Sequence, residues 1–456
     1  MGGLTVSTIA ETALENPRQS VGRAVVAATV GNMLEWYDFT IYAAFAVPIS
    51  KSFFPADSEV VSLLLGLVTF GLGFVARPFG AAFLGGYADR RGRRDALSLT
   101  ILLMAFGTGI IALCPTYDRI GLAAPIIILL ARLIQGFSAG GEIGGATAYL
   151  LESAEPAQRG RVASWLEASM GMANILGALA AFSVTAVLST SEVQAWGWRI
   201  PFIFGLTIAP VGLYLRRSLD ETDAFQAEER QRAHAAKPKA PLFEIFRSHG
   251  RSLFVGFCVA VLWAVAVYVL MIYLPTYVQR ADTFGFSAAQ AFGASLIGNI
   301  PFVFGCVWFG SWSDRIGRRR SLALSAGLLF IAVLPLFLWL KADPTLPTLI
   351  IVQAIVCLLV ASFVGVAPAA LSEIFPTGVR STGTSLVYNG AFTLFGGFAP
   401  MILTWLIQRS GGSIYSPAWY VMLAAGVALI AIPFLGRRES PVPAPTAGFP
   451  TVTSES

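Results

Sequence analysis

The sequence GGYADRRGRR at residues 85–94 returns, with changes, as GSWSDRIGRR at residues 310–319. Each copy lies where one long apolar run ends and the next begins. A short basic hinge with a glycine turn, placed at the same point in each half of a chain, indicates a two-fold internal repeat. Many membrane carriers are built from such repeats, so this stretch favours a protein that moves a small molecule across a membrane.

A second pair of residues repeats with nearly the same period. Glu152 is followed seven residues later by Arg159, and Glu373 is followed seven residues later by Arg380. The two pairs stand about 220 positions apart, close to the spacing of the two basic hinges. Two separate features with one period support the duplication of a six-span unit.

The composition places the chain in a membrane. Of its 456 residues, 55% are hydrophobic and 12% are charged, about half the charged fraction of a soluble chain. We predict an all-α membrane protein with twelve transmembrane helices in two pseudo-symmetric six-helix bundles. The expected spans are residues 24–50, 61–84, 96–115, 123–151, 161–188, 198–215, 252–279, 289–310, 321–340, 346–372, 383–407 and 416–435.

The domain organisation follows from the apolar runs and the polar segments between them. We expect a cytoplasmic N-terminal segment (1–22), an N-terminal bundle (23–216), a cytoplasmic linker (217–250), a C-terminal bundle (251–437) and a disordered cytoplasmic tail (438–456). Charge and the sequence KPKAP at residues 237–241 mark the linker, part of which, at 221–232, is expected to form an amphipathic helix at the membrane surface. Proline and small polar residues mark the tail.

The net charge of +5 is a matter of topology. About 23 of the lysines and arginines fall on the side of the membrane that holds both termini, and about five fall in the opposite loops. The positive-inside rule then predicts that both termini are cytoplasmic, and we expect the chain in a bacterial inner membrane. A nucleic-acid partner is not expected, and we expect a monomer.

Cysteine and histidine usage excludes several other classes of function. The four cysteines are scattered through apolar segments, and their spacing fits neither a metal site nor a redox pair. Both histidines, His234 and His249, lie in the linker. A membrane enzyme would need a nucleophile with a base at depth, so we expect neither an enzyme nor a cofactor or metal.

Six ionisable residues fall inside the expected spans: Glu35, Asp38, Arg77, Arg132, Glu142 and Glu167. Each such charge costs roughly 2.5–3.5 kcal/mol at the bilayer centre. All six unpaired would therefore cost on the order of 15–20 kcal/mol. They are expected to pair, to face a shared polar cavity, or both.

Depth and helical spacing predict how these groups meet. Glu35 lies about 16 Å and Arg132 about 14 Å into their spans, so we expect them to pair near the midplane. Glu35, Asp38 and Tyr42 share one helix face, as do Gln135 and Glu142 beside Arg132. Asn174 shares a stripe with Glu167. A purely structural brace between Glu35 and Arg132 remains an alternative reading.

Without a histidine in the membrane, proton carriage falls to a carboxyl group. An apolar setting favours its protonated form and a nearby arginine favours its ionised form. Asp38 and Glu35 are the first candidates and Glu142 the next.

Substrate binding is expected to divide between the two halves. Arg132 and Arg77 suit an anionic substrate because the planar guanidinium matches a carboxylate. In the second half, the candidates to line the cavity are polar or aromatic: Tyr268, Tyr273, Asn299, Gln353, Tyr388 and Asn389. Tyrosines at such positions can equally be packing residues. Gln135, Tyr42 and Asn174 complete the predicted binding set.

The two hinges are expected to act as a gate. Asp89 and Asp314 are predicted to pair with basic groups at the second repeated element. The arginines beside them (Arg90, Arg93, Arg315 and Arg318) can pair with carboxylates at helix ends. That element supplies Glu152, Arg159, Glu373 and Arg380. Topological charge with a turn is the alternative, and it leaves the matching aspartate and glycine of both hinges unexplained.

Glycines in the fourth span repeat every four residues at Gly136, Gly140 and Gly144. Within an apolar helix this pattern predicts close helix packing. A nucleotide-binding loop would need a preceding strand, which the sequence does not offer.

The hinge pattern resembles the major facilitator superfamily, over roughly residues 22–438. Five stretches resemble its metabolite:proton symporter family: GNMLEWYDF (31–39), RPFG (77–80), QGFSAGGE (135–142), WGWRIPF (196–202) and RRSLDET (216–222). The family includes symporters of citrate, α-ketoglutarate, shikimate, and proline or betaine. GFSAG at residues 136–140 and SPAWY at residues 416–420 look closest to the citrate and tricarboxylate members. The Pro-Glu-Ser-Pro-Arg pattern of sugar carriers is absent after the sixth span.

The resemblance implies proton-coupled uptake by alternating access, and it leaves the substrate open. The first reading is a small organic anion such as citrate or a related di- or tricarboxylate. The second is a zwitterion such as proline or betaine, which would need balanced charge and an aromatic cage.

Overall fold

The computed structural model describes residues 17–91, 93–217, 242–280, 283–376, 379–410 and 414–436. These residues form helices joined by short connections, and they contain no β-strand. A helix satisfies every backbone polar group within one segment, which a bilayer demands. The prediction of an all-α membrane protein is confirmed.

The first half makes six passages, several of them divided into two helices. Its elements are α2 (Pro17–Ala44), α3 (Ala46–Phe53), α4 (Glu59–Val75), α5 (Arg77–Arg91), α6 (Arg93–Leu113), α7 (Tyr117–Ile120), α8 (Ala123–Gly140), α9 (Glu142–Ser153), α10 (Arg159–Val187), α11 (Thr190–Ala195), η2 (Gly197–Arg199) and α12 (Ile200–Arg217).

The second half makes six more, and two of them contain a π-helical turn, η3 and η4. Its elements are α14 (Leu242–Val267), η3 (Tyr268–Tyr273), α15 (Leu274–Gln279), α16 (Ala288–Ile316), α17 (Arg318–Ala342), α18 (Leu346–Val364), α19 (Ala367–Glu373), α20 (Arg380–Ala391), η4 (Phe392–Gly397), α21 (Ala399–Arg409), α22 (Ser416–Ala431) and η5 (Ile432–Phe434).

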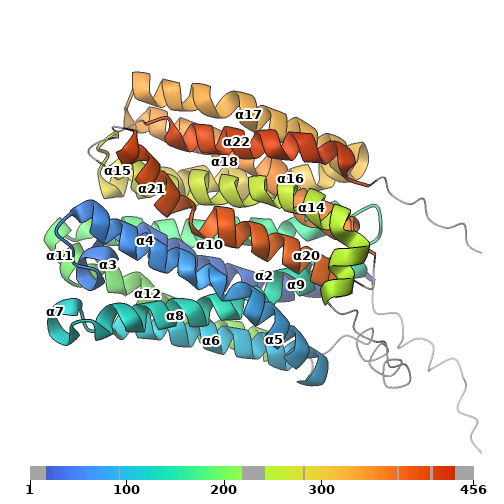
Figure 1. Ribbon diagram of the computed structural model, residues 1–456, viewed down its shortest axis with the longest axis horizontal. Coiled ribbons are helices and arrows are strands. Elements are labelled where there is room, and N and C mark those ends of the chain that lie inside the picture. The colour runs from blue at the N-terminus through green and yellow to red at the C-terminus, as the bar shows by residue number, and fades with distance from the viewer. Residues whose placement is uncertain are drawn as a thin grey trace, which may run out of the picture.

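The helices lie side by side along one direction, with the first half (blue to green) below the second (yellow to red) in Figure 1. Nine helices of the described chain are long and apolar enough to cross a membrane. The other three passages are α2, α6 and α12, which have 28, 21 and 18 residues. The predicted twelve helices in two bundles are confirmed.

Proline in the first turn of a later helix marks the break in five passages. These prolines are Pro48, Pro78, Pro275, Pro368 and Pro400. Proline has no N–H to continue the helical ladder, and it disfavours helical geometry in the residue before it. In the second passage this break falls between α4 and α5 and makes Arg77 the first residue of α5.

The antiparallel helices α10 and α16 form one seam between the halves. A Cβ atom on Gly160 would lie 2.5 Å from the carbonyl oxygen of Gly310, and one on Gly171 would lie 2.5 Å from the ring of Phe302. The same seam brings Asn174 Nδ2 within 3.5 Å of Asn299 Oδ1. Small residues let these two backbones approach closely.

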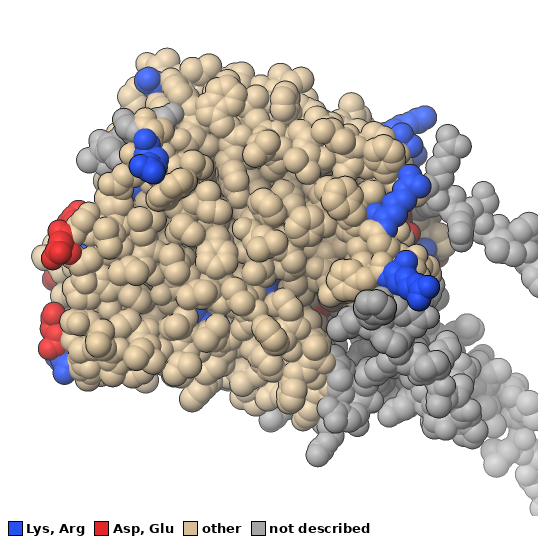
Figure 2. All heavy atoms as spheres, viewed as in Figure 1, with Lys and Arg blue, Asp and Glu red and all other residues tan. Residues whose placement is uncertain are grey.

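Charged side chains gather at the two ends of the molecule, and the broad band between them is almost entirely uncharged on the face shown in Figure 2. The hinges predicted from the sequence lie at one end, called the hinge end below. All four cysteines are buried and unpaired, as expected of small apolar residues.

The structure differs from the sequence prediction at the end of the expected linker. Helix α14 begins at Leu242, inside the segment expected as linker, and contains a non-helical residue at His249 (φ −125°, ψ 22°). The rest of the expected linker, including the helix at 221–232, lies outside the described residues. So do the tail after residue 436 and residues 1–16.

Candidate functional site

Glu35 of α2 forms an ion pair with Arg77 of α5 in the middle of the first half. The distance from Arg77 Nη2 to Glu35 Oε1 is 3.0 Å. Arg77 is 0% exposed and Glu35 7% exposed. The guanidinium also stacks on Phe74 and Phe39, at 4.3 and 5.0 Å from the ring centres. Aromatic faces and the carboxylate together offset the loss of water around this charge.

The expected pair between Glu35 and Arg132 is therefore wrong. Both residues are buried in the protein, but Glu35 reaches across to α5. Arg132 stacks instead on Tyr42, Phe70 and Phe39, at 4.4, 4.8 and 4.9 Å. The Phe39 ring therefore contacts the guanidinium groups of both Arg77 and Arg132. Depth along a span predicts the layer of a residue, but only packing decides its partner.

Arg132 connects to Asp38 through two neutral side chains. Arg132 Nη1 donates to Gln135 Oε1 at 2.7 Å, and Gln135 Nε2 donates to Thr108 Oγ1 at 3.0 Å. Thr108 Oγ1 is in turn hydrogen-bonded to Asp38 Oδ2. All four residues are at most 5% exposed. The chain joins α8, α6 and α2 in one buried network.

Both guanidinium groups keep donors that bind nothing in the described structure. Arg77 Nε and Nη1 and Arg132 Nε and Nη2 are buried without a hydrogen-bond partner, as is the hydroxyl of Tyr268. Buried polar groups are almost always paired, because leaving them unpaired is costly. Unpaired donors on two neighbouring cations can bind a ligand rich in acceptor oxygens.

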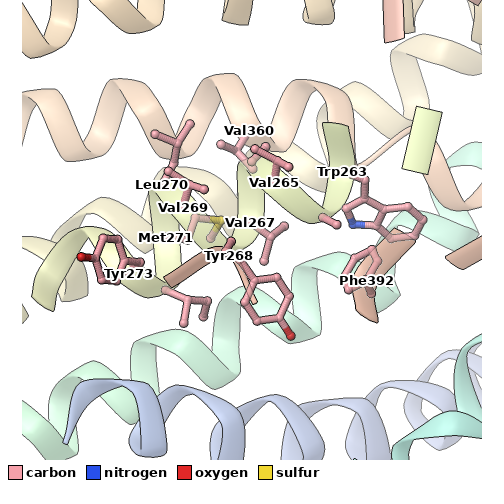
Figure 3. Close-up of a cluster of buried hydrophobic side chains, with 14 of the residues drawn as sticks. Trp263, Val265, Val267, Tyr268, Val269, Leu270, Met271, Tyr273, Val360 and Phe392 are labelled. Atoms are coloured by element: carbon pink, nitrogen blue, oxygen red, sulfur yellow. The ribbon is translucent and has the colours of Figure 1, made fainter. Parts of the chain in front are cut away.

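Tyr268 brings the second half to the two arginines. It is the first residue of the π-helical turn η3, and Figure 3 shows its ring pointing away from that turn toward the blue and green helices of the first half. Its ring centre lies 5.4 Å from that of Phe74 and 5.8 Å from that of Trp36. It lies close enough to Arg77 and Arg132 to interact electrostatically with both.

An aromatic cluster continues from Tyr268 into the second half. Tyr388 stacks on Phe392 with ring centres 3.8 Å apart, and Trp263 lies against both. A Cβ atom on Gly396 would lie 2.8 Å from the Tyr268 ring, so glycine in η4 makes room for this packing. The binding residues predicted in the second half therefore face those of the first.

The predicted amides bind across helices. Asn174 Oδ1 accepts from Thr40 Oγ1 at 2.6 Å. Asn389 Nδ2 donates to the Gly140 carbonyl at 3.2 Å, which links the two halves, and its Oδ1 is buried without a partner. Gln353 Nε2 donates to the Leu270 carbonyl inside η3 at 3.4 Å.

Glu142, the third predicted proton carrier, lies in a pocket inside the first half. Helices α2, α6, α8, α9 and α12 line it, and Glu35, Asp38, Thr100, Thr108 and Ser138 share it with Glu142. The pocket therefore connects all three predicted proton carriers, and it is separate from the seam between the halves.

At the hinge end, Asp314 binds the start of a helix from the other half. Its two carboxylate oxygens accept from the backbone N–H groups of Gly160 and Arg161, at 2.9 and 3.0 Å. Those groups have no partner within α10, and the helix dipole favours an anion there. Arg318 joins the contact, with Nη2 at 2.7 Å from Asp314 and 3.2 Å from Glu373.

We expected Asp314 to bind basic side chains at the opposite hinge, and this prediction is wrong. Asp314 binds backbone N–H groups there instead. Arg159 Nε instead binds the Leu151 carbonyl and Arg380 Nε binds the Ser372 carbonyl, both at 3.2 Å and both eight residues back. Glu152 and Arg315 are exposed. The side chains of Asp89, Arg90 and Arg93 lie outside those that the structure describes.

Sequence reasoning missed the residues that connect the predicted ones. Thr108 is one of several threonines within spans, and nothing in the sequence distinguishes it. The rings that hold the guanidinium groups, Phe39, Phe70 and Phe74, resemble ordinary core residues. Glu167 was recognised as an ionisable group in a span but given no role, and it lies beside Trp263 of the other half.

Comparisons with known proteins agree with this architecture. Residues 28–342 and 294–454 match the Major Facilitator Superfamily. The citrate-proton symporter of Salmonella typhi is 38% identical, covering 91% of this chain and 94% of its own. The proline/betaine transporter of Escherichia coli K12 is 32% identical, covering 90% and 82%.

Solved structures show the same fold. A partially occluded inward-open structure of the xylose transporter XylE from E. coli superposes with a TM-score of 0.68 at 18% identity, covering 91% of this chain and 96% of the other. The fold, the repeated hinges and the matches over nine-tenths of the sequence lead to one conclusion. The chain belongs to the Major Facilitator Superfamily.

Proposed function

We propose that this protein is a secondary active transporter that takes up a small organic anion together with protons. The substrate we propose is citrate or a related di- or tricarboxylate. The observation that best supports this proposal is the set of unpaired, buried hydrogen-bond donors on Arg77, Arg132 and Tyr268. A carboxylate accepts two parallel hydrogen bonds from a guanidinium, so two arginines suit a substrate with more than one carboxylate.

The relatives support this assignment. Two of them, from Salmonella typhi and Klebsiella pneumoniae, are named citrate-proton symporters and are 38% and 37% identical to this chain. Both match over 91% of this chain.

The proposed mechanism is alternating access, in which the two bundles rock about the central site. Asp314 closes the hinge end by binding the start of α10, and Arg318, which also pairs with Glu373, holds Asp314 in place. The contact between Asp314 and α10 breaks when that end opens. The distribution of lysine and arginine favours a cytoplasmic hinge end, with both termini on the cytoplasmic side of a bacterial inner membrane. We propose a monomer whose partners are the substrate, the proton and the bilayer.

Proton coupling is assigned to the buried carboxyl groups of the first half. Protonation of Asp38 or Glu35 from outside removes a negative charge beside the arginines and strengthens their attraction for an anion. Loss of the proton on the inner side restores the competing carboxylate and weakens substrate binding. Glu142 lies on the route by which protons reach the other two.

A zwitterionic substrate is the second candidate, and one observation favours it. Trp36, Tyr268, Phe392, Tyr388 and Trp263 form a continuous aromatic cluster at the interface, and such clusters can hold a quaternary ammonium. The relatives named proline/betaine transporters fit this reading. However, Arg77 and Arg132 both lie close to Tyr268 of that cluster, and two positive charges there favour the anion.

Uptake into proteoliposomes with an acidic exterior tests the proposal. Citrate, α-ketoglutarate, shikimate and betaine are compared at equal concentration, with and without a protonophore. We expect citrate or another carboxylate to accumulate and the protonophore to abolish the accumulation. Accumulation of betaine alone would establish the second candidate, and carboxylate uptake indifferent to the protonophore would remove proton coupling.

A further inference from the structure

We propose that Thr108 is a positioning residue that transmits the protonation state of Asp38 to Arg132. The observation is the buried chain from Arg132 through Gln135 and Thr108 to Asp38. The carboxyl group and the guanidinium make no direct ion pair in the described structure, and two neutral side chains separate them. The inference rests on the proposed function for its transport readout only.

The direction of each hydrogen bond follows from the chemistry of its partners. A guanidinium has only donors, so the Gln135 atom facing Arg132 is the amide oxygen. The amide nitrogen then faces Thr108 and donates to its hydroxyl oxygen. Arg132 therefore fixes the orientation of the Gln135 amide.

This arrangement leaves Thr108 one proton and two possible acceptors. Its hydroxyl oxygen lies 2.9 Å from the Met104 carbonyl and also contacts Asp38 Oδ2. When Asp38 is ionised, its carboxylate can only accept, so the Thr108 proton must point to it. When Asp38 is protonated, its O–H donates to Thr108, whose own proton turns to the Met104 carbonyl. Both states satisfy every group with one rotation of a hydroxyl.

The two states differ in what reaches Arg132. With Asp38 ionised, donors and acceptors align from the guanidinium to the carboxylate, and each bond strengthens the next. With Asp38 protonated, the charge at the end of the chain is gone. Arg132 then keeps Gln135 as a neutral partner, and it attracts an anion more strongly at Nε and Nη2, which have no partner in the described structure.

The surroundings of Asp38 contain few other charges that could carry this signal. Glu35 and Tyr37 come from the same helix, and Glu142 of α9 lines the same pocket. Arg77 of α5 is paired with Glu35, and Glu167 of α10 lies beside Trp263. Helix α12 contributes Gly205, where a Cβ atom would lie 3.4 Å from Asp38 Oδ1. Among the described side chains, Thr108 is the hydrogen-bonded route from Asp38 to Arg132.

The test compares Thr108→Val, which keeps the side-chain shape without the hydroxyl, with Thr108→Ser, which keeps the hydroxyl. Thr185→Val is the matched control, because Thr185 Oγ1 also binds a carbonyl four residues back in its own helix but lies far along α10 from the site. Radiolabelled citrate is the probe in proteoliposomes. We expect Thr108→Val to retain citrate exchange and to lose pH-driven accumulation by about tenfold or more, with Thr108→Ser and Thr185→Val near wild type.

A second measurement does not depend on the substrate. The infrared difference spectrum of the purified protein between alkaline and acidic buffer contains a carboxyl band that Asp38→Asn removes. We expect Thr108→Val to shift this band and Thr185→Val to leave it in place. Thr108→Cys, a weak donor of similar size, replaces Thr108→Val if that variant does not fold.

The outcomes separate the two proposals. An unshifted Asp38 band and normal pH-driven accumulation in Thr108→Val would overturn the role of Thr108, whatever the substrate is. Absence of pH-driven uptake in the wild type would instead contradict the proposed function. A shifted band with lost accumulation and retained exchange supports the inference.

Discussion

The two halves of the molecule share a fold and differ in what they bury. The offset of 221 positions that relates Arg159 to Arg380 also relates Arg132 to Gln353 and Glu167 to Tyr388. The first half therefore holds charge where the second holds an amide and a phenol. We propose that the two halves of this duplicated scaffold have different roles, the first recognising the charge of the substrate and the second its shape.

The two halves also differ in how closely their helices pack. In the first half, a Cβ atom on Gly136 would lie 1.7 Å from the Gly73 carbonyl, and one on Gly140 would lie 1.9 Å from the Arg77 carbonyl. The positions 221 residues later are Cys357 and Ala361. Close backbone contact holds the arginine-bearing helices rigidly together, whereas the second half contains both π-helical turns of the described chain. π-helical turns are frequent at functional sites.

The largest effect is expected from Arg132→Gln, which gives the first half the residue that the second half has. Loss of the guanidinium leaves the aromatic faces and Gln135 without their charged partner. We expect initial uptake of citrate to fall by roughly a hundredfold or more. Gln353→Ala is the matched change in the other half and should cost far less. Equal losses in both variants would break the proposed division.

The glycine contact is the next test, and its readout is stability. Gly136→Ala forces α4 and α8 apart next to Arg132, so the apparent unfolding temperature in detergent should fall by at least about 3 °C. Gly145→Ala is the control, because a Cβ atom there meets nothing within 4 Å. An unchanged unfolding temperature in Gly136→Ala would show that the first half is not held by this contact.

The contact at the hinge end is expected to be weaker. Asp314→Asn weakens the anionic cap on α10 and the pair with Arg318, so the amides of Gly160 and Arg161 should exchange with deuterium about tenfold faster. Asp343→Asn is the control, since Asp343 binds Thr345 and Thr348 within its own half. Unchanged exchange at Gly160 and Arg161 would remove Asp314 from the gate.

The smallest effect is expected from Tyr268→Phe, which removes one unpaired donor and keeps the ring. We expect KM for citrate to rise about threefold to tenfold without a change in the pH dependence of uptake. Tyr273→Phe serves as the control, because the Tyr273 hydroxyl meets Thr404 inside the second half. A changed pH dependence in Tyr268→Phe would place part of the proton coupling in the second half.

Most of the fold could be predicted from the sequence, because the sequence patterns of membrane-spanning helices are strong. Apolar runs, charge bias and two repeated motifs predict the spans and the two bundles. The helix breaks at Pro78 and Pro400 are also readable, since proline removes a backbone donor.

The sequence predicts which residues belong to the site, but it does not predict which of them contact one another. Arg77, Arg132, Glu35 and Asp38 stand out because charge in a bilayer is costly. The choice of Arg77 over Arg132 as the partner of Glu35 depends on helix rotation and on where α5 begins. The role of Thr108 depends on three helices meeting, and no spacing within one helix encodes that.

We propose that buried carboxyl groups of the first half couple the proton to the substrate. The direct measurement is citrate accumulation against citrate exchange in proteoliposomes with an acidic exterior, for Asp38→Asn and Glu35→Gln. We predict that Asp38→Asn exchanges citrate and no longer accumulates it in response to the pH gradient. Accumulation that remains driven by the pH gradient in both variants would contradict the account.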